Sequence, residues 1–258
     1  MRAALLLYVG AVFVFVFAPI VASVVFSFNS DRFPSIPLGS FTLNWYETAF
    51  ADDSPIWEAF RNSLIVSVCA ATLSTLIGFA TAYTDYRYGF RFKAGYIALA
   101  LLPPTVPLII LALAMLAWLS QLGLSGTLTG IVVAHTVLGA PFAMAVTRLR
   151  LSQMDPSLEA AAWNLGASEW GAMRHVVLPF CLPAIISAFC LTAAVSFDEF
   201  AVAWFVSGLN KTVPVAILEI LQGNVDPQIN AIGTVVFLTS MALVTVAQLL
   251  LMAKGRKA

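Results

Sequence analysis

Residues 159–179 of this chain read EAAAWNLGASEWGAMRHVVLP and lie between two of its most hydrophobic stretches. The segment carries acidic and basic residues, two tryptophans, Trp163 and Trp170, and two glycines, Gly166 and Gly171. Charges, tryptophans and turn-forming glycines in one short segment indicate a folded polar insert rather than another apolar helix. The surrounding sequence decides where that insert lies.

The composition places the surrounding chain in a membrane. Of its 258 residues, 60% are hydrophobic and 10% are charged, and its mean hydropathy is +0.92. A water-soluble domain of this length does not need so much apolar surface to fill its core. The formal net charge of zero gives no sign of nucleic acid or of an acidic partner. The cysteines, Cys69, Cys181 and Cys190, have no CxxC spacing, so we expect them to pack in apolar surroundings.

Six stretches are long enough to cross a hydrocarbon core of about 30 Å, which takes roughly 20 helical residues. We therefore expect an all-α integral membrane protein, with a single transmembrane domain over residues 1–258. The expected spans lie near 5–27, 61–83, 94–118, 129–149, 180–206 and 229–252. The apolar run from Ala3 to Phe26 is too long for the core of a secretory signal, so we expect it to be retained.

The basic residues between the spans predict the orientation. With the N-terminus inside, ten of the 13 Lys and Arg residues fall in cytoplasmic segments and three in outer segments. The cytoplasmic ones are Arg2, Arg87, Arg91, Lys93, Arg148, Arg150, Arg174, Lys254, Arg256 and Lys257, and the outer ones are Arg32, Arg61 and Lys211. Both termini are therefore predicted to be cytoplasmic, and so is the insert.

Local signals predict a helical hairpin in the insert. Asp155 is a favourable N-cap and Pro156 a favourable first residue for a short helix that runs to Asn164. Gly166 can adopt the left-handed conformation that closes a helix. Ser168 and Glu169 then favour the start of a second short helix, and Pro179 is expected to start the next span.

The insert resembles the EAA loop found in permease subunits of ABC importers. That pattern has Glu-Ala-Ala, a short spacer, Leu-Gly or a similar pair, a longer spacer, and hydrophobic-x-Leu-Pro. The matching residues are Ala161, Ala162, Gly166, Val176, Leu178 and Pro179. Further segments resemble the polyamine branch of these permeases: FNSDRF, FTLNWYETAF, RNSLIVS, SFDEFAVAWFVSG and VDPQINAIGT.

The chain departs from the pattern at one position. When it is aligned on Gly166, the family's glutamate falls on Ala160, and Glu159 is displaced by one residue, about 100° around a helix. The displaced acid is therefore not expected to make the usual contact to the ATPase. The resemblance implies that ATPase coupling involves Glu159, Ala160, Ala161, Ala162, Gly166, Ala167, Ser168, Leu178 and Pro179.

The resemblance also implies a function and a set of partners. It implies six transmembrane helices in the type I importer permease fold, in the inner membrane of a bacterium. The solute would be a small cation, in the first place spermidine or putrescine, and the alternative is an opine, an aminophosphonate or an amino acid derivative. The partners would be two ATPase subunits, a second homologous permease and a periplasmic or extracellular solute-binding protein.

The ATP site is expected on the partner subunits. The chain contains no GxxxxGK[ST] segment, so ATP and Mg²⁺ would be bound by the ATPase subunits and this chain would hold no cofactor. HExxH and GxSxG segments are also absent, which argues against a membrane enzyme. His135 and His175 are far apart in the predicted topology, and a lone histidine in a span usually hydrogen-bonds to a neighbouring helix.

Two other interpretations stay open. The insert could be an ordinary capped loop with Trp163 and Trp170 at the membrane interface. The chain could also be a channel or a secondary transporter, although such folds usually show internal repeats or paired broken helices, and no repeat is visible here.

An acidic pair in the fifth predicted span points to the solute path. Asp198 and Glu199 are costly inside a membrane, so we expect them to face a water-filled path rather than lipid. Adjacent helical residues point about 100° apart, so one of the two would line the path while the other caps or pairs elsewhere. We assign Asp198, Glu199 and Trp204 to the path and favour Asp198 as its acid. A purely structural polar pair is the alternative.

Prolines and glycines mark possible sites of bending and close packing. Pro103, Pro104 and Pro107 remove backbone hydrogen bonds in the third predicted span and should kink it, either as a moving joint or as a static bend. Gly126 and Gly130 have the small-xxx-small spacing that allows two helices to approach closely, which by itself is weak evidence.

Overall fold

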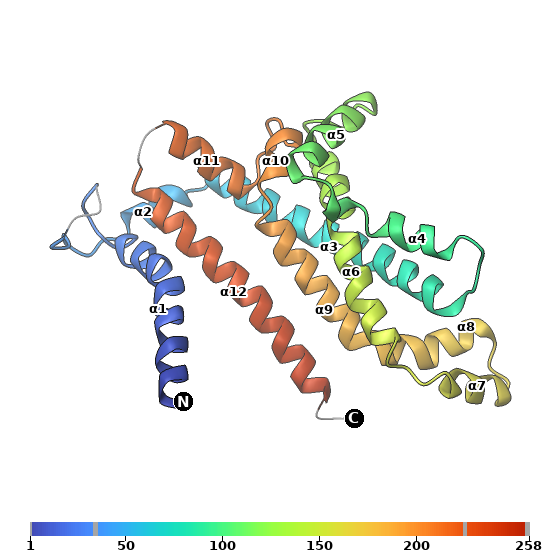
Figure 1. Cartoon of the computed structure of the whole chain (residues 1–258). Coiled ribbons are helices and arrows are strands. Elements are labelled where there is room, and N and C mark those ends of the chain that lie inside the picture. Colours follow the sequence, from blue (N-terminus) through green and yellow to red (C-terminus); the bar gives the residue numbers. More distant parts are fainter. Residues whose placement is uncertain (1, 33–35, 224–225, 256–258) are drawn as a thin grey trace. The chain divides into compact units, whose positions relative to one another are not determined.

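The computed structural model describes residues 2–32, 36–223 and 226–255, without the side chains of residues 3 and 246–255. Arg256 and Lys257, two of the basic residues used for the orientation, lie outside the described residues. Within these ranges all extended regular elements are helices (Figure 1). The chain forms two compact units, one of residues 1–60 and 213–241 and the other of residues 61–212 and 242–258.

The first unit is built from the two ends of the sequence. It holds α1 (Arg2–Phe26), α2 (Asn44–Ala49), the start of α3 (Pro55–Arg87), α11 (Val213–Gly223) and the start of α12 (Gln228–Gly255). Its core contains Ala49, Ile56, Ala59, Val213, Ala216 and Ile232. The segments FNSDRF and FTLNWYETAF meet in this unit, because the Trp45 indole N–H donates to the Asn29 carbonyl oxygen at 2.8 Å.

The second unit contains the rest of α3 and the middle of the chain. Its further elements are α4 (Lys93–Ala100), η1 (Pro103–Thr105), α5 (Leu108–Gln121), α6 (Leu128–Leu151), α7 (Ser157–Asn164), α8 (Glu169–Ala172), η2 (Met173–Val177), α9 (Leu178–Phe197) and α10 (Ala201–Val206). Helices α6 and α9 pack side by side, and α5 packs on α10 (Figure 1). Cys181 is buried between α6 and its neighbours as expected, whereas Cys69 is exposed on α3.

Five helices are long and apolar enough to cross a membrane: Ala4–Phe26, Pro55–Arg87, Leu128–Leu151, Glu169–Phe197 and Gln228–Thr245. The expected span at 94–118 is not one helix, because α4 ends at Ala100 and α5 begins at Leu108. Prolines 103, 104 and 107 cause the break, since they supply no backbone N–H and restrict the residue before them. The prolines thus interrupt the helix rather than merely kink it.

The fifth predicted span also differs from a single helix over 180–206. Helix α9 ends at Phe197, and α10 begins only at Ala201. At the other end, Pro179 does not start the span, because α8, the π-helical turn η2 and α9 run on without interruption from Glu169. The Leu178 N–H donates to the Met173 carbonyl five residues back, and this wider turn accommodates Pro179, which has no N–H of its own.

The close approach suggested by Gly126 and Gly130 involves a different partner. Gly126 lies before the start of α6, at a φ of +76°, and its N–H donates to the Val206 carbonyl at 2.9 Å. A side chain at Gly208 would come within 2.9 Å of the Gly126 Cα. Two glycines in loops therefore pack against each other, and no pair of helices meets through a small-xxx-small face here.

Candidate functional site

The insert forms the expected pair of short helices, which we call the hairpin (α7, the turn at Gly166 and α8). The Asp155 carboxylate accepts a hydrogen bond from the Ser157 N–H at 2.9 Å, and this bond holds the pKa of Asp155 below its ordinary value. Gly166 has a φ of +86°, and the Ser168 hydroxyl accepts from the Gly171 N–H at 3.1 Å. The predicted turn at Gly166 and cap at Ser168 are confirmed. Helix α7 begins at Ser157 with Pro156 at its N-cap position, one residue later than predicted, although the Asp155 carboxylate still accepts from the first N–H of the helix.

The turn itself is a Schellman motif. The Gly166 N–H donates to the Trp163 carbonyl at 2.9 Å, and the Ala167 N–H donates to the Ala162 carbonyl at 3.0 Å. This pattern satisfies the last carbonyls of α7 and requires a left-handed residue between them, which glycine provides without steric cost. The backbone of Gly166 therefore sets the direction in which α8 leaves α7.

Glu159 points into the protein and not toward the solvent. Its side chain is buried near the end of α3 that carries Tyr83 and Tyr86, and its Oε1 has no hydrogen-bond partner among the described residues. Ala160, which occupies the position of the family's glutamate, is exposed, as is Ala161. The one-residue displacement therefore turns the acid inward, and an apolar methyl group stands on the outer face of α7 instead.

Arg87, at the end of α3, joins both arms of the hairpin. Its guanidinium lies 4.6 Å from the centre of the Trp163 ring on α7 and 3.4 Å from a carboxylate oxygen of Glu169 on α8. A guanidinium can stack on an aromatic face and pair with a carboxylate at the same time. Trp163 thus contributes to holding the hairpin on α3, a role that its placement at the membrane interface alone would not give it.

The outer face of the hairpin is apolar and uncovered in this chain. It includes Leu158, Leu165 and Trp170, and Leu165 is 89% exposed. Exposed apolar residues grouped in this way are typical of a surface that another protein covers. On the other side, the start of the long helix packs on α6, because Val177 and Cys181 share a buried cluster with Leu151. Leu178 is half-buried and Pro179 is exposed.

The second predicted site lies at the break between α9 and α10. Glu199 is buried and accepts hydrogen bonds from the N–H groups of Val202 at 2.9 Å and Ala203 at 3.0 Å, so it caps α10. Its carboxylate also lies 3.3 Å from Nε2 of His135 on α6. The other ring nitrogen of His135 is 2.8 Å from the Ser196 hydroxyl, which confirms the predicted hydrogen bond to a neighbouring helix.

The structure brings Glu199 and the prolines of the third span together. A cavity of about 500 Å³ is lined by Pro103, Pro104, Pro107, Leu138, Phe142 and Glu199, among others. We call it the outer cavity. Asp198 ends α9 and is exposed, whereas Trp204 is half-buried and its ring lies 5.8 Å from that of Phe200. The three predicted path residues therefore have different surroundings, and Glu199 is the one that lines the cavity.

Several polar contacts escaped the sequence analysis. They join Glu199 to His135, Arg87 to the hairpin, and Asp85 of α3 to Lys93 and Arg148. The sequence signal for Asp85 is an acid two residues from the end of an apolar span, because a buried charge at such a place requires a partner. Its partners lie far away in the sequence, so only the fold identifies them. No three His, Cys, Asp or Glu residues among those described are grouped to hold a metal ion.

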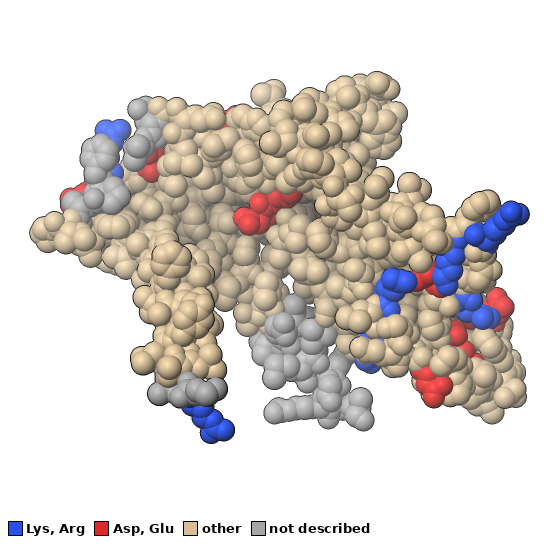
Figure 2. Space-filling model, in the orientation of Figure 1, with Lys and Arg blue, Asp and Glu red and all other residues tan. Residues whose placement is uncertain are grey.

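The charges of the second unit are strongly segregated. On the face shown in Figure 2, Lys and Arg gather at the end that carries α7 and α8, together with a few acids. A separate acidic patch lies in the middle of this face, near the junction of α9 and α10 (Figures 1 and 2). The basic residues at this end are among those from which the cytoplasmic side was predicted.

Comparison with known proteins gives consistent similarities. The sequence profile of the family described as binding-protein-dependent transport system inner membrane component matches residues 74–255. The chain is 33% identical to the spermidine/putrescine transport system permease protein PotC of Haemophilus influenzae, over 94% of each protein. It is 32% identical to the putrescine transport system permease protein PotI of Escherichia coli, over 95% of the chain and 89% of the relative.

Solved structures show the same fold. A chain of a bacterial ABC transporter involved in the import of the acidic polysaccharide alginate superposes with a TM-score of 0.78, at 16% identity, over 98% of this chain and 95% of that one. The all-helical permease fold inferred from the sequence is therefore confirmed, and the segment expected as the third span is divided between α4 and α5.

Proposed function

The chain belongs to the family of inner-membrane components of binding-protein-dependent transport systems, and on that premise we propose that it carries a polyamine through the membrane. It is a permease subunit of an ABC importer, and ATP is hydrolysed by partner subunits. Its relatives PotC and PotI are named for spermidine and putrescine transport. The observation that carries the proposal is the acidic pair at the α9–α10 break, beside the outer cavity.

The charge of this site suits a cationic amine. Glu199 is the charged residue among those that line the outer cavity, and the adjacent Asp198 is exposed. A carboxylate held in apolar surroundings attracts an ammonium group more strongly than one in bulk water. A polyamine carries several ammonium groups at neutral pH, so such a pair would favour it over an anionic solute.

The hairpin would be the contact to the ATPase. Its exposed apolar residues fit a surface that docks into a partner, and Arg87 and the continuous helix from Glu169 tie it to two spans of the second unit, α3 and α9. We propose two ATPase subunits on the cytoplasmic side, a second homologous permease as the other half of the path, and a binding protein on the outer side. Both termini would then be cytoplasmic.

Purification and transport test this function together. The membrane complex, isolated through a tag on this chain, should contain an ATPase subunit. In proteoliposomes with ATP inside and the cognate binding protein outside, it should take up radiolabelled spermidine or putrescine. A variant of the ATPase subunit that binds ATP without hydrolysing it serves as the control.

The outcomes separate the solute from the role of the chain. Uptake of an aminophosphonate or an amino acid derivative without uptake of a polyamine would refute the proposed solute and leave the permease role intact. A chain that moves solute without any ATPase would contradict the proposed assembly.

A further inference from the structure

A second cavity lies at the end of the second unit that carries the basic residues. Its volume is about 620 Å³, and we call it the inner cavity. Residues from α3, from the segment after α4 and from the end of α6 line it, among them Asp85, Leu101, Ala145, Arg148, Leu149 and Ser152. The hairpin follows directly after α6, so this cavity lies close to the part of the chain assigned to the ATPase contact.

One face of α6 lines both cavities. Leu138 and Phe142 line the outer cavity, and Ala145, Leu149 and Ser152 line the inner one. At about 100° per residue these five positions fall within an arc of about 80° around the helix axis. From Phe142 to Ser152 the helix rises by about 15 Å. The two cavities therefore share this stripe of α6, while Met144, Arg148 and Leu151, which also line the inner cavity, lie outside the arc.

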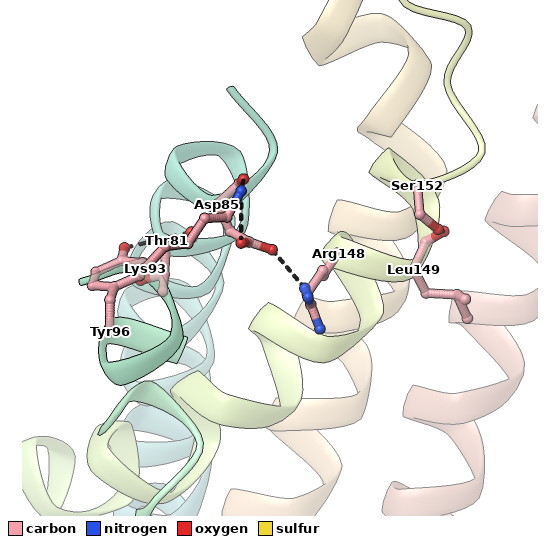
Figure 3. Close-up of polar contacts among 7 residues, drawn as sticks. All are labelled: Thr81, Asp85, Lys93, Tyr96, Arg148, Leu149 and Ser152. Atoms are coloured by element: carbon pink, nitrogen blue, oxygen red, sulfur yellow. Dashed lines mark hydrogen bonds and ion pairs between the residues drawn. The ribbon is translucent and has the colours of Figure 1, made fainter. Parts of the chain in front are cut away.

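The surroundings of the inner cavity carry a surplus of positive charge when Lys93, which pairs with Asp85 from outside the lining, is counted. Asp85 is buried, and its carboxylate lies 2.6 Å from Nε of Arg148 and 3.3 Å from Nζ of Lys93 (Figure 3). The Lys93 ammonium also donates to the Asp85 backbone carbonyl. Two cations thus face one carboxylate, and Arg148 remains half-exposed in the cavity wall. Leu149 and Ser152 project from the other side of this turn of α6 (Figure 3).

The two cavities have opposite electrostatic character. The outer cavity holds Glu199 beside Asp198, and the inner cavity holds Asp85 with one cation more than its charge requires. A solute with several ammonium groups would be attracted to the first and repelled from the second. This difference in charge along α6 lowers the affinity for the cationic solute at the inner cavity. It does not weaken binding of the solute at the outer cavity.

We propose that the inner cavity is the cytoplasmic section of the solute path and that Arg148 makes it a release site for the cationic solute. This inference rests on the proposed function, because it requires a cation as cargo. The Ala145–Leu149–Ser152 stripe offers the leaving cation no carboxylate, and the only acid of the cavity is already paired. The solute therefore leaves the path and does not rebind from the cytoplasm.

Inhibition of uptake by internal spermidine should depend on the charge of the inner cavity. We suggest proteoliposomes with the complete importer, ATP and increasing unlabelled spermidine inside, and labelled spermidine with the binding protein outside. Ser152→Asp adds a carboxylate to the inner cavity without touching the Asp85 ion pairs. Internal spermidine should inhibit uptake by this variant at a concentration about fivefold lower than in the wild type. The reason is that one added carboxylate within a few ångströms of the cation raises the affinity for it about fivefold. Arg148→Gln should shift sensitivity in the same direction.

A matched control excludes a general effect of charge. Gln153→Glu adds the same charge one residue further on, at an exposed position that does not line the cavity, and it should respond to internal spermidine as the wild type does. Lys93→Gln removes the second cation on Asp85 and should shift the sensitivity in the same direction as Arg148→Gln. Equal responses of Ser152→Asp and Gln153→Glu would overturn the inference. Absence of spermidine uptake by the wild type would instead refute the proposed solute.

Discussion

Asp198 and Glu199 are neighbours in the sequence but have different tasks in the structure. Glu199 is buried and caps α10, whereas Asp198 is exposed at the end of α9. We predict that Asp198→Asn lowers polyamine uptake about tenfold or more, because a charge-assisted contact to an ammonium group is lost, and leaves the melting temperature unchanged. Glu199→Gln should lower uptake, because it removes the charge that lines the outer cavity, and should also lower the melting temperature, since the carboxylate cap and its contact to His135 are weakened. Uptake rates in proteoliposomes and thermal unfolding in detergent measure both effects.

The pair of variants separates the exposed carboxylate from the buried one that lines the outer cavity. Full uptake in Asp198→Asn would remove this carboxylate from the solute path and leave selection to the binding protein. A melting temperature that falls equally in both variants would show that the two acids form one structural unit.

At the scale of the element, the hairpin depends on the left-handed turn at Gly166. A Cβ atom at residue 166 would meet no atom within 4 Å, so the backbone φ of +86° is what restricts the residue type at this position. We predict that Gly166→Val abolishes transport while the protein stays in the membrane, because a β-branched residue tolerates this conformation poorly and redirects α8. Gly166→Asn is the matched control, since asparagine adopts the left-handed conformation readily, and it should keep most of the activity.

ATPase measurements complete this comparison. Gly166→Val should also uncouple solute-stimulated ATP hydrolysis, and Gly166→Asn should not. Loss of coupling in both variants would indicate that the outer surface at residue 166, and not the direction of the turn, is what the ATPase requires.

At the scale of the whole molecule, the distribution of basic residues predicts the topology. Reporter fusions after Lys93 and after Arg150 should be cytoplasmic, and a fusion near Asp53 should be periplasmic, because ten of the 13 basic residues fall on the predicted inner side. Alkaline phosphatase and fluorescent-protein activities of the fusions check this. The reverse pattern would contradict the topology and, with it, the contact between the hairpin and an ATPase.

The sequence by itself determined the features that depend on neighbouring residues. Long apolar runs identified the membrane helices, since hydropathy is summed over adjacent positions. The caps at Asp155 and Ser168 and the turn at Gly166 were predicted correctly, because each is stabilised within four residues of chain. The prolines of the third span were predicted to kink it, and the structure divides it after Ala100. The break after Phe197 was missed, because no proline or glycine marks it in the sequence.

Only the tertiary structure decided which distant residues meet. It joined Glu199 to His135, Arg87 to both arms of the hairpin, and Asp85 to Arg148. It also turned Glu159 inward onto α3, which the one-residue displacement alone left open. These contacts follow from how α3, α6 and α9 pack, and many arrangements of the same helices satisfy the same hydropathy. Buried charges must find partners wherever the packing places them, and that placement is a property of the whole fold.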